Sequence, residues 1–207
     1  MGISDRKERE KDEMRRHILD SAMKLFKENG FEEVSIRKIA DLIEYSPTTI
    51  YLHFTSKDDI LLALHEEGFD KLNALFKPLL SIKDPIERVE QFGHVYMKFG
   101  LDHPEYYDLM FLKSGPLEAL EKEGHEEWNG GDNAFSYLVN ATGEIARMHP
   151  DLALNPEVMA TTLWSMVHGF VCLQLRNRLC WFSEDQPSAN QMGFMGLKWL
   201  TNILRSV

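Results

Sequence analysis

The sequence predicts an all-α protein with a small N-terminal three-helix domain and a larger helical domain. Apolar residues recur at spacings of three and four in nearly every segment, and no segment shows the period-two alternation of a strand. Residues 35–57 also contain two short helical patterns separated by a tight turn. We therefore expect a domain at residues 12–72 that contains a helix-turn-helix, joined by a long helix to a domain at residues 73–207.

Composition places the chain among globular proteins without a membrane segment. No run approaches the roughly 20 apolar residues of a membrane span, and the N-terminus is charged, so we expect a cytoplasmic protein with no membrane partner. The formal net charge is −10, of which residues 1–54 contribute −1 and the remainder −9. Charge alone therefore does not suggest a nucleic-acid partner. Cys172 and Cys180 form no framework of spacings, so we expect reduced thiols.

The first helix of the N-terminal domain is expected from Ile18 onward. Residues 1–16 mix charges without an apolar stripe, which predicts a frayed helix start or a disordered arm. Basic residues in this arm could contact phosphates or a minor groove, but the interleaved acids favour a solvated arm. These basic residues are Arg6, Lys7, Arg9 and Lys11. Beyond Ile18, one apolar face continues to Phe26, and Asn29-Gly30 ends the helix with residues that tolerate a left-handed cap.

Residues 36–54 carry the helix-turn-helix pattern. The apolar stripe of the first helix consists of Ile36, Ile39, Ala40 and Ile43. Ser46-Pro47 then starts a second helix, because serine can accept an orphan backbone N–H and proline suits the first helical position. Ile50 and Phe54 point inward, which leaves an outer face rich in hydrogen-bonding groups. A short helix with such a face, braced by another helix, can enter the DNA major groove.

These residues resemble a known family. The run from Ser35 through the second helix to Ser56-Lys57 is similar to the DNA-binding module of the TetR family of transcriptional regulators. The resemblance implies DNA contacts on both helices, with Arg37 and Lys57 placed to hold phosphates on either side of the groove. The DNA-binding residues expected in this way are Ser35, Arg37, Ser46, Pro47, Thr48, Thr49, Tyr51, Leu52, His53 and Lys57.

The turn departs from the family pattern. The family usually has glycine where this chain has Glu44 or its neighbour, since a helix C-terminal cap often needs the left-handed conformation. We therefore expect a costlier turn or one of a different shape.

The remaining chain reads as helices only. Thr55 or Ser56 caps a helix of some 20 residues, about 30 Å long, that leaves the N-terminal domain. Helices are then expected from Asp84-Pro85 to residue 103, over residues 106–111 and 135–148, from Asn155-Pro156 to residue 179, and over residues 188–207. Residues 113–133 are predicted to form a loop or a broken helix.

Small residues line the last two predicted helices. The segment from Trp164 to His168-Gly169 resembles a signature of one branch of the TetR family, in which the C-terminal helices form the dimer. Narrow seams on two consecutive helices suit a symmetric four-helix interface. The expected interface residues are Ser165, Gly169, Cys172, Arg176, Gly193, Gly196, Leu200 and Leu204.

A ligand cavity is expected in the body from the family resemblance, for a small, mostly apolar molecule. Aromatic residues and methionines concentrate there, although helical cores use the same residues without any cavity. The pocket residues expected are Phe99, Tyr106, Met110, Phe111, Phe135, Trp164 and His168.

Other chemistry is not expected. His168 and Cys172 share a helix face at a spacing of four, but two ligands do not make a metal site, so we expect neither a metal nor a cofactor. No phosphate loop, nucleophile elbow, paired-carboxylate motif or metal-binding helix motif is visible in the sequence, which argues against an enzyme.

Two functional hypotheses follow. In the first, the protein is a dimeric regulator, a repressor released from a palindromic operator by its effector. In the second, the same DNA-binding module is joined to a body that binds a partner protein and no small molecule, with residues 113–133 as the partner surface.

Overall fold

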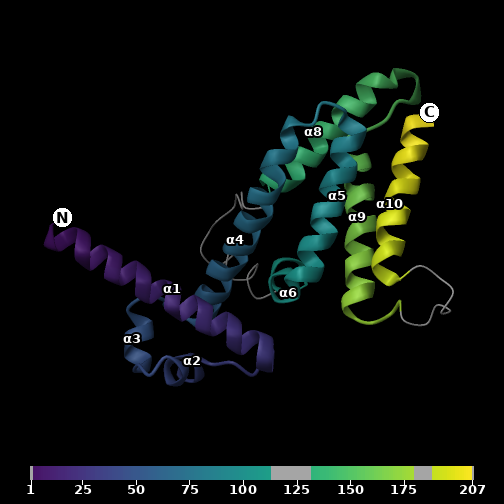
Figure 1. The fold of residues 1–207 in the computed structure, drawn as a ribbon. Helices are drawn as coiled ribbons and strands as arrows, with labels where there is room; N and C mark the ends of the chain where they lie inside the picture. Colours follow the sequence, from purple (N-terminus) through teal and green to yellow (C-terminus); the bar gives the residue numbers. More distant parts are fainter. Residues whose placement is uncertain (1, 113–131, 180–187, 207) are drawn as a thin grey trace. The chain divides into compact units, whose positions relative to one another are not determined.

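The secondary structure of the described residues consists of helices without a strand, as the sequence predicts (Figure 1). The computed structural model describes residues 2–112, 132–179 and 188–206. Its helices are α1 Ile3–Asn29, α2 Ile36–Leu42, α3 Pro47–Tyr51, α4 Lys57–Phe76, α5 Pro85–Asp102, α6 Pro104–Phe111, α8 Asp132–Met148, α9 Pro156–Leu175 and α10 Ala189–Ser206, with short 3-10 helices η1 Lys77–Ser81 and η2 Pro150–Leu152. Apart from residues 132 and 133 at the start of α8, the predicted partner surface at residues 113–133 lies outside the described residues, as does Cys180.

The chain divides into two compact units. Unit 1 comprises Met1–Gly68 and Glu105–Glu127, and unit 2 comprises Phe69–Pro104 and Trp128–Val207. Helix α4 belongs to both units, because the division falls between Gly68 and Phe69. Unit 1 therefore contains the helix-turn-helix together with α6.

Helix α1 begins at Ile3, so the prediction of a frayed or disordered arm over residues 1–16 is wrong. The backbone N–H of Gly2 donates to a carboxylate oxygen of Asp5 at 3.0 Å. Along the next turns, Arg6 pairs with Glu10 at 2.7 Å and Arg9 with Glu13 at 3.8 Å. Ion pairs four residues apart stabilise a helix that has no apolar face. Ion pairs between side chains, rather than burial of apolar side chains, therefore stabilise the first turns of α1.

The core of unit 1 joins α1, α2, α3 and the first half of α4. Its most deeply buried members are Ile18, Ala22, Phe26, Val34, Ile39, Ala40, Ile50, Phe54, Ile60 and Leu64. Ser35 and Ser46 start α2 and α3, each accepting a backbone N–H from three residues further on. These local caps and the apolar spacing are the features that the sequence predicts.

In the turn after α2, Glu44 adopts the left-handed conformation. Glu44 has a φ of 59°, and the next amide, that of Tyr45, donates to the carbonyl of Ala40 at 3.0 Å. This bond pattern closes the helix end in the way that usually employs glycine. A glutamate at this φ brings its Cβ close to backbone atoms.

We predict that Glu44→Gly stabilises the protein by about 1 kcal/mol, because glycine carries no left-handed penalty. Urea denaturation of the full-length variant measures this gain. Glu33→Gly is the control: Glu33 is exposed and outside the left-handed region, so this change should lower stability by about 0.5–1 kcal/mol. Equal losses in both variants would contradict the assignment of strain to Glu44.

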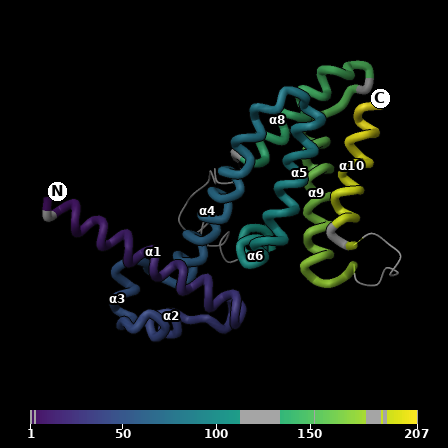
Figure 2. The backbone as a smooth tube through the Cα atoms, viewed as in Figure 1, coloured from purple at the N-terminus to yellow at the C-terminus, as the bar shows by residue number. Residues whose placement is uncertain are grey.

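In unit 2, α5 contacts α8, α9 and α10, and Figure 2 shows α5, α9 and α10 side by side. Asp84 starts α5 by accepting the backbone N–H of Ile86 at 2.9 Å, and Asn155 starts α9 by accepting that of Val158 at 2.9 Å. Both helix starts are confirmed predictions. The buried residues of this core include Ile86, Val89, Phe92, Tyr96, Met97, Phe99, Ala141, Ile145, Val167 and Leu197.

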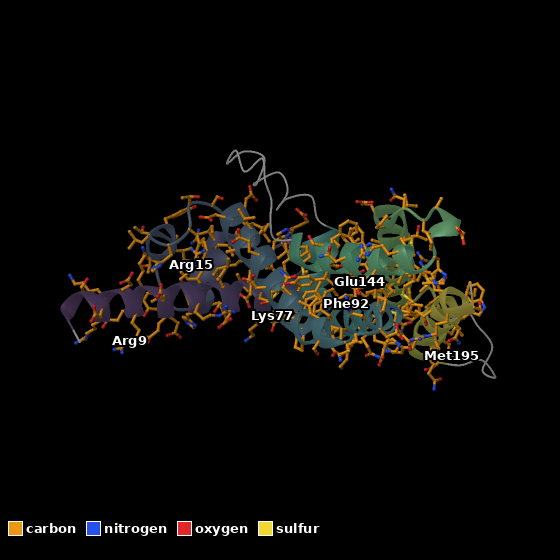
Figure 3. All side chains as sticks on the ribbon, turned by 90° about the horizontal axis from the view of Figure 1, so that it is seen from above. Arg9, Arg15, Lys77, Phe92, Glu144 and Met195 are labelled. Atoms are coloured by element: carbon orange, nitrogen blue, oxygen red, sulfur yellow. The ribbon has the colours of Figure 1, made fainter. Side chains whose placement is uncertain are left out.

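A partly buried ion pair holds α8 to α5. The Arg88 guanidinium donates to both carboxylate oxygens of Glu144, at 2.8 and 3.1 Å, and to the Ile82 carbonyl at 2.9 Å. Figure 3 labels Glu144 near Phe92 of the core. The bond to Arg88 lowers the pKa of the Glu144 carboxyl, so the pair stays charged down to mildly acidic pH.

Candidate functional site

Helix α3 presents an exposed polar and aromatic face. Ile50 and Phe54 are buried, whereas Tyr51 is 55 % and Leu52 is 74 % exposed. Pro47 and Thr48 are exposed as well. Burying one stripe against α1 and α4 leaves the outer groups of this short helix available to a groove. The outward orientation of this face is a confirmed prediction.

Several predicted site residues also organise the local backbone. The Ser46 hydroxyl oxygen accepts the Thr49 backbone N–H at 3.2 Å and lies 3.0 Å from the Thr49 hydroxyl. Ser35 accepts the Lys38 backbone N–H at 3.3 Å. The two serines are therefore helix caps, and the Ser35 hydroxyl keeps a hydrogen that it can donate to an acceptor.

The two predicted phosphate-binding cations differ in their surroundings. Arg37 is exposed near the start of α2, and the described residues provide it with no ion pair. Lys57, at the start of α4, is half-buried, and its ammonium donates to the carbonyl of Phe31. An ammonium carries three N–H donors, so Lys57 can still bind a second acceptor.

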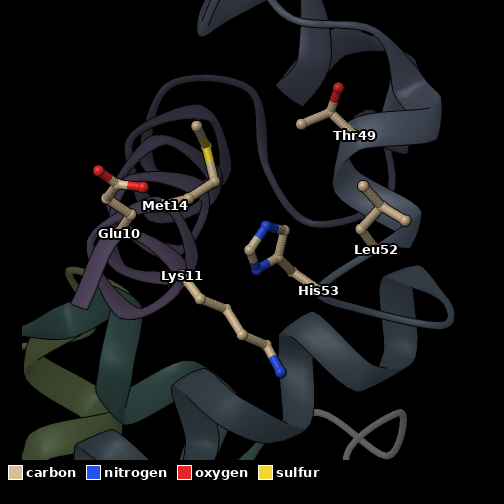
Figure 4. Close-up of a pocket in the computed structure, with 6 residues that line it drawn as sticks. All are labelled: Glu10, Lys11, Met14, Thr49, Leu52 and His53. Atoms are coloured by element: carbon tan, nitrogen blue, oxygen red, sulfur yellow. The ribbon is translucent and has the colours of Figure 1, made fainter. Parts of the chain in front are cut away.

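A shallow depression lies between α1 and α3 within unit 1 (Figure 4). Its volume is about 390 Å³, and its lining residues are Glu10, Lys11, Met14, Thr49, Leu52 and His53. Nearby, Arg15 donates to the His53 carbonyl at 3.2 Å, and its guanidinium lies 4.2 Å from the centre of the Phe54 ring. Burial, followed by the charges of Lys11 and Arg15, lowers the pKa of the His53 imidazole. His53 is therefore neutral near pH 7.

Sequence reasoning missed that α1 forms one wall of this depression. Lys11 and Met14 belong to a segment that the sequence predicts to be an arm, and only their spacing on a continuous helix places them beside α3. The signal was the recurrence of Lys7, Lys11 and Arg15 at intervals of four.

Three of the predicted pocket residues come together in unit 2. The Trp164 ring centre lies 6.0 Å from that of Phe135 and 5.8 Å from that of His168. The Trp164 indole N–H donates to the hydroxyl of Tyr96 at 3.0 Å, and that hydroxyl lies 3.0 Å from Nδ1 of His168. Tyr96, which is absent from the predicted pocket, therefore links the Trp and His of the family signature. Burial lowers the pKa of the His168 imidazole.

The other predicted pocket residues have separate surroundings. Phe99 is buried in unit 2, 5.3 Å from the ring of His103. Tyr106, Met110 and Phe111 belong to unit 1. The predicted pocket is therefore divided between the two units rather than gathered in one.

In unit 1, Tyr106 takes part in a polar cluster that sequence reasoning missed. Its hydroxyl donates to Glu67 at 2.6 Å, and Glu67 also accepts two hydrogen bonds from Arg16, at 2.8 and 3.0 Å. Burial and the neighbouring carboxylate raise the pKa of the Tyr106 hydroxyl, which keeps its proton for this bond. The cluster fixes α6 to α4 and α1.

The predicted interface residues fall into two groups. Ser165 and Arg176 are exposed, and no atom of the described residues lies within 4 Å of a Cβ built on Gly169 or Gly196. Cys172, Leu200 and Leu204 form the second group and are half-buried. The Cys172 sulfur lies 3.4 Å from Nε2 of His168.

The prediction that Gly193 belongs to the dimer interface is wrong. It is buried inside the protomer, where its Cβ would lie only 2.4 Å from Cε1 of Phe170. The absence of a side chain lets α10 approach α9 within the same chain, so we assign Gly193 to that internal seam.

Helices α9 and α10 expose large apolar side chains that the sequence did not single out. Trp199 is 65 % and Met195 is 58 % exposed, one turn apart on α10, and Ile203 follows after another turn. Leu173 is exposed on α9. By length and composition alone, α9 could span a membrane, but core helices of other proteins pass the same test. An exposed apolar row of this kind marks an interaction surface.

An all-α fold with an exposed helix-turn-helix is typical of DNA-binding transcriptional regulators. Residues 18–64 match the model of bacterial regulatory proteins of the tetR family, and residues 89–192, more than half of the chain, match the tetracyclin repressor-like C-terminal domain. The chain belongs to the TetR family of transcriptional repressors, and the predicted absence of an enzymatic role agrees with this membership.

Proteins with similar sequences are named as transcriptional regulators. The chain is 25 % identical over 164 residues to the HTH-type transcriptional repressor AcnR of Corynebacterium diphtheriae, covering 76 % of this chain and 78 % of AcnR. It is 32 % identical over 87 residues to the HTH-type transcriptional regulator UidR of Escherichia coli K12, covering 42 % of this chain and 41 % of UidR.

Solved structures share the fold. The fatty acid degradation regulator FadR from Bacillus halodurans superposes with a TM-score of 0.67 at 16 % identity, covering 92 % of this chain and 93 % of FadR. The TetR family regulator PfmR from Thermus thermophilus gives a TM-score of 0.62 at 20 % identity, covering 89 % of this chain and 97 % of PfmR. At these identities the likeness concerns the fold alone.

Proposed function

We propose that this protein is a homodimeric cytoplasmic repressor that leaves a palindromic operator when a small, mostly apolar effector binds. Residues 12–72 bind the operator in this proposal, and residues 73–207 bind the effector and form the dimer. The observation that carries the proposal is the exposed apolar row of Met195, Trp199 and Ile203 in a chain whose other unit carries an exposed DNA-reading helix.

Two-fold symmetry explains why the operator would be palindromic. Pairing the apolar faces of α9 and α10 with the same faces of a second copy buries them in a closed, symmetric interface. Two copies of α3 then read two half-sites, about 34–36 Å or a multiple of that distance apart. Within each half-site, Tyr51 and Lys57 are the residues that we expect to contribute most.

The aromatic cluster of unit 2 supports an effector with an apolar body. Phe135 and Trp164 offer apolar surface, and the hydroxyl of Tyr96 and the ring of His168 are polar groups that could orient a ligand. Ligand sites in proteins combine apolar walls with few polar groups in this way. To release DNA, the effector must bind one conformation of the dimer more tightly than the other.

Selection of bound fragments from random DNA by the full-length protein, at two salt concentrations, tests the operator. We expect a palindromic motif whose affinity falls as salt rises. A set of apolar metabolites is then tested for stabilisation of the protein against heat and for release of that DNA. A folded protein that enriches no motif would contradict the proposal, whereas a motif with no stabilising compound would leave the repressor without its effector and favour a partner-controlled body.

A further inference from the structure

The basic residues of α1 fall into two groups on different faces of the helix. Arg6, Arg9 and Arg16 each pair with a carboxylate four residues further on, at 2.7, 3.8 and 2.6 Å. Lys7 and Lys11 are exposed, and no carboxylate of the described chain pairs with either of them. Along residues 6–16 of α1, the positive charge is therefore neutralised on one side and available on the other.

The available charges face the DNA-reading helix. Lys7, Lys11 and Arg15 recur every fourth residue, about 6 Å apart along the axis, and so form one row. Arg15 donates to the His53 carbonyl, and Lys11 lines the depression beside His53 (Figure 4). Figure 3 labels Arg15 and Arg9 on different sides of α1. The row therefore borders α3, with Lys7 one turn further out.

The depression has the chemistry of a cradle for a sugar–phosphate backbone. Met14 and Leu52 supply apolar surface for a deoxyribose, and Lys11, on the other side of His53 from Leu52, supplies an ammonium for a phosphate at the edge of the depression (Figure 4). Glu10 also lines it, but its carboxylate is held by Arg6 at 2.7 Å, which offsets its repulsion of an anion. The depression thus offers apolar surface with a cation at its edge.

The net charge of the N-terminal residues makes Lys7 and Lys11 important for DNA affinity. Residues 1–54 carry a net charge of −1, so the N-terminal unit has no general positive field to attract DNA. Affinity for the backbone must then come from a few cations that are not neutralised locally.

We propose that Lys7 and Lys11 bind phosphates of the DNA strand beside α3 and so extend each half-site beyond the base pairs that α3 reads. This inference rests on the proposed function, because it needs an operator. The contacts are independent of base sequence, and they contribute affinity and salt dependence rather than specificity.

The test compares two variants of the full-length protein, Lys7→Gln/Lys11→Gln and Arg6→Gln/Arg9→Gln/Glu10→Gln; in the second, Glu10 is replaced together with its partner Arg6 so that no unpaired carboxylate is left in the depression. Each removes two positive charges from the same part of α1. The slope of log affinity against log salt changes by about 0.9 for each phosphate that the protein no longer neutralises. The lysine variant loses four such contacts per dimer and should therefore show a slope shallower by about 3.6, and the arginine variant a change of at most half that size. Circular dichroism verifies that α1 remains helical in both.

Shortened operators give a second readout. As base pairs are removed from the outer ends, wild-type affinity should fall to that of the lysine variant, which should lose little itself. Equal slopes for wild type and lysine variant, equal changes in the two variants, or equal losses on shortened DNA would overturn the phosphate role while the operator assignment stands. A wild-type protein that selects no operator would overturn both.

Discussion

Replacing Thr49 and Tyr51 by alanine is expected to abolish specific operator binding and to leave a folded dimer. Tyr51 is 55 % exposed, so its ring contributes little to the core. Specific sites are usually bound at least about 10³-fold more tightly than random DNA, and the double variant should lose that whole margin. Fluorescence anisotropy with operator and scrambled duplexes measures the ratio.

The local structure predicts that this variant keeps its fold. The Thr49 backbone N–H still donates to Ser46, so the cap of α3 survives the loss of the Thr49 hydroxyl. Tyr51→Phe is the matched variant: it keeps the ring and should retain most of the affinity if the ring packs against the DNA, but not if the hydroxyl binds a phosphate. Unchanged operator affinity in the double variant would show that α3 does not read the DNA.

The second large effect is expected from Met195→Glu combined with Trp199→Glu, which should convert the dimer to monomers. Both side chains are mostly exposed in the protomer, so acids there cost the monomer little. Central aromatic residues of interfaces often contribute about 2–4 kcal/mol each, and two-fold symmetry would bring four new negative charges together. Sedimentation velocity at micromolar concentration measures the change.

Leu52→Glu is the matched control for this variant. Leu52 is also a highly exposed apolar residue, at 74 %, but it lies at the end of α3, the helix that we propose reads the DNA. We expect it to leave the dimer unchanged and to weaken DNA binding. A Met195/Trp199 variant that remains dimeric would place the interface on another surface.

Helix boundaries in this chain were predictable where a local signal specifies them. Ser46-Pro47, Asp84-Pro85 and Asn155-Pro156 each supply a side-chain acceptor and a preset φ, and all three begin helices as expected. The strain at Glu44 was predictable for the same reason, because a helix end needs a left-handed residue whatever lies around it. Residues 3–16 escaped prediction since their helix depends on charge pairing instead of burial.

For the candidate sites, the sequence predicts which residues share a helix face but not which neighbour that face contacts. Gly193 and Gly196 both lie on a stripe of small residues, yet they are about 60° apart around α10, and only the packing of α10 decides which one faces α9. Tyr96 follows the apolar spacing of α5 and so resembles any core residue, although its hydroxyl joins Trp164 to His168. Contacts between distant segments of the chain determine both outcomes.

Gly68 has a consequence for how this sequence can evolve. A Cβ at this position of α4 would lie 2.6 Å from the sulfur of Met110 and 3.2 Å from the ring of Tyr106. Any larger residue at 68 therefore requires the Met110 side chain to move or to be smaller, or α6 must shift and strain the bond from Tyr106 to Glu67. Substitutions at positions 68 and 110 should therefore be coupled in evolution, because each changes the space that the other residue needs.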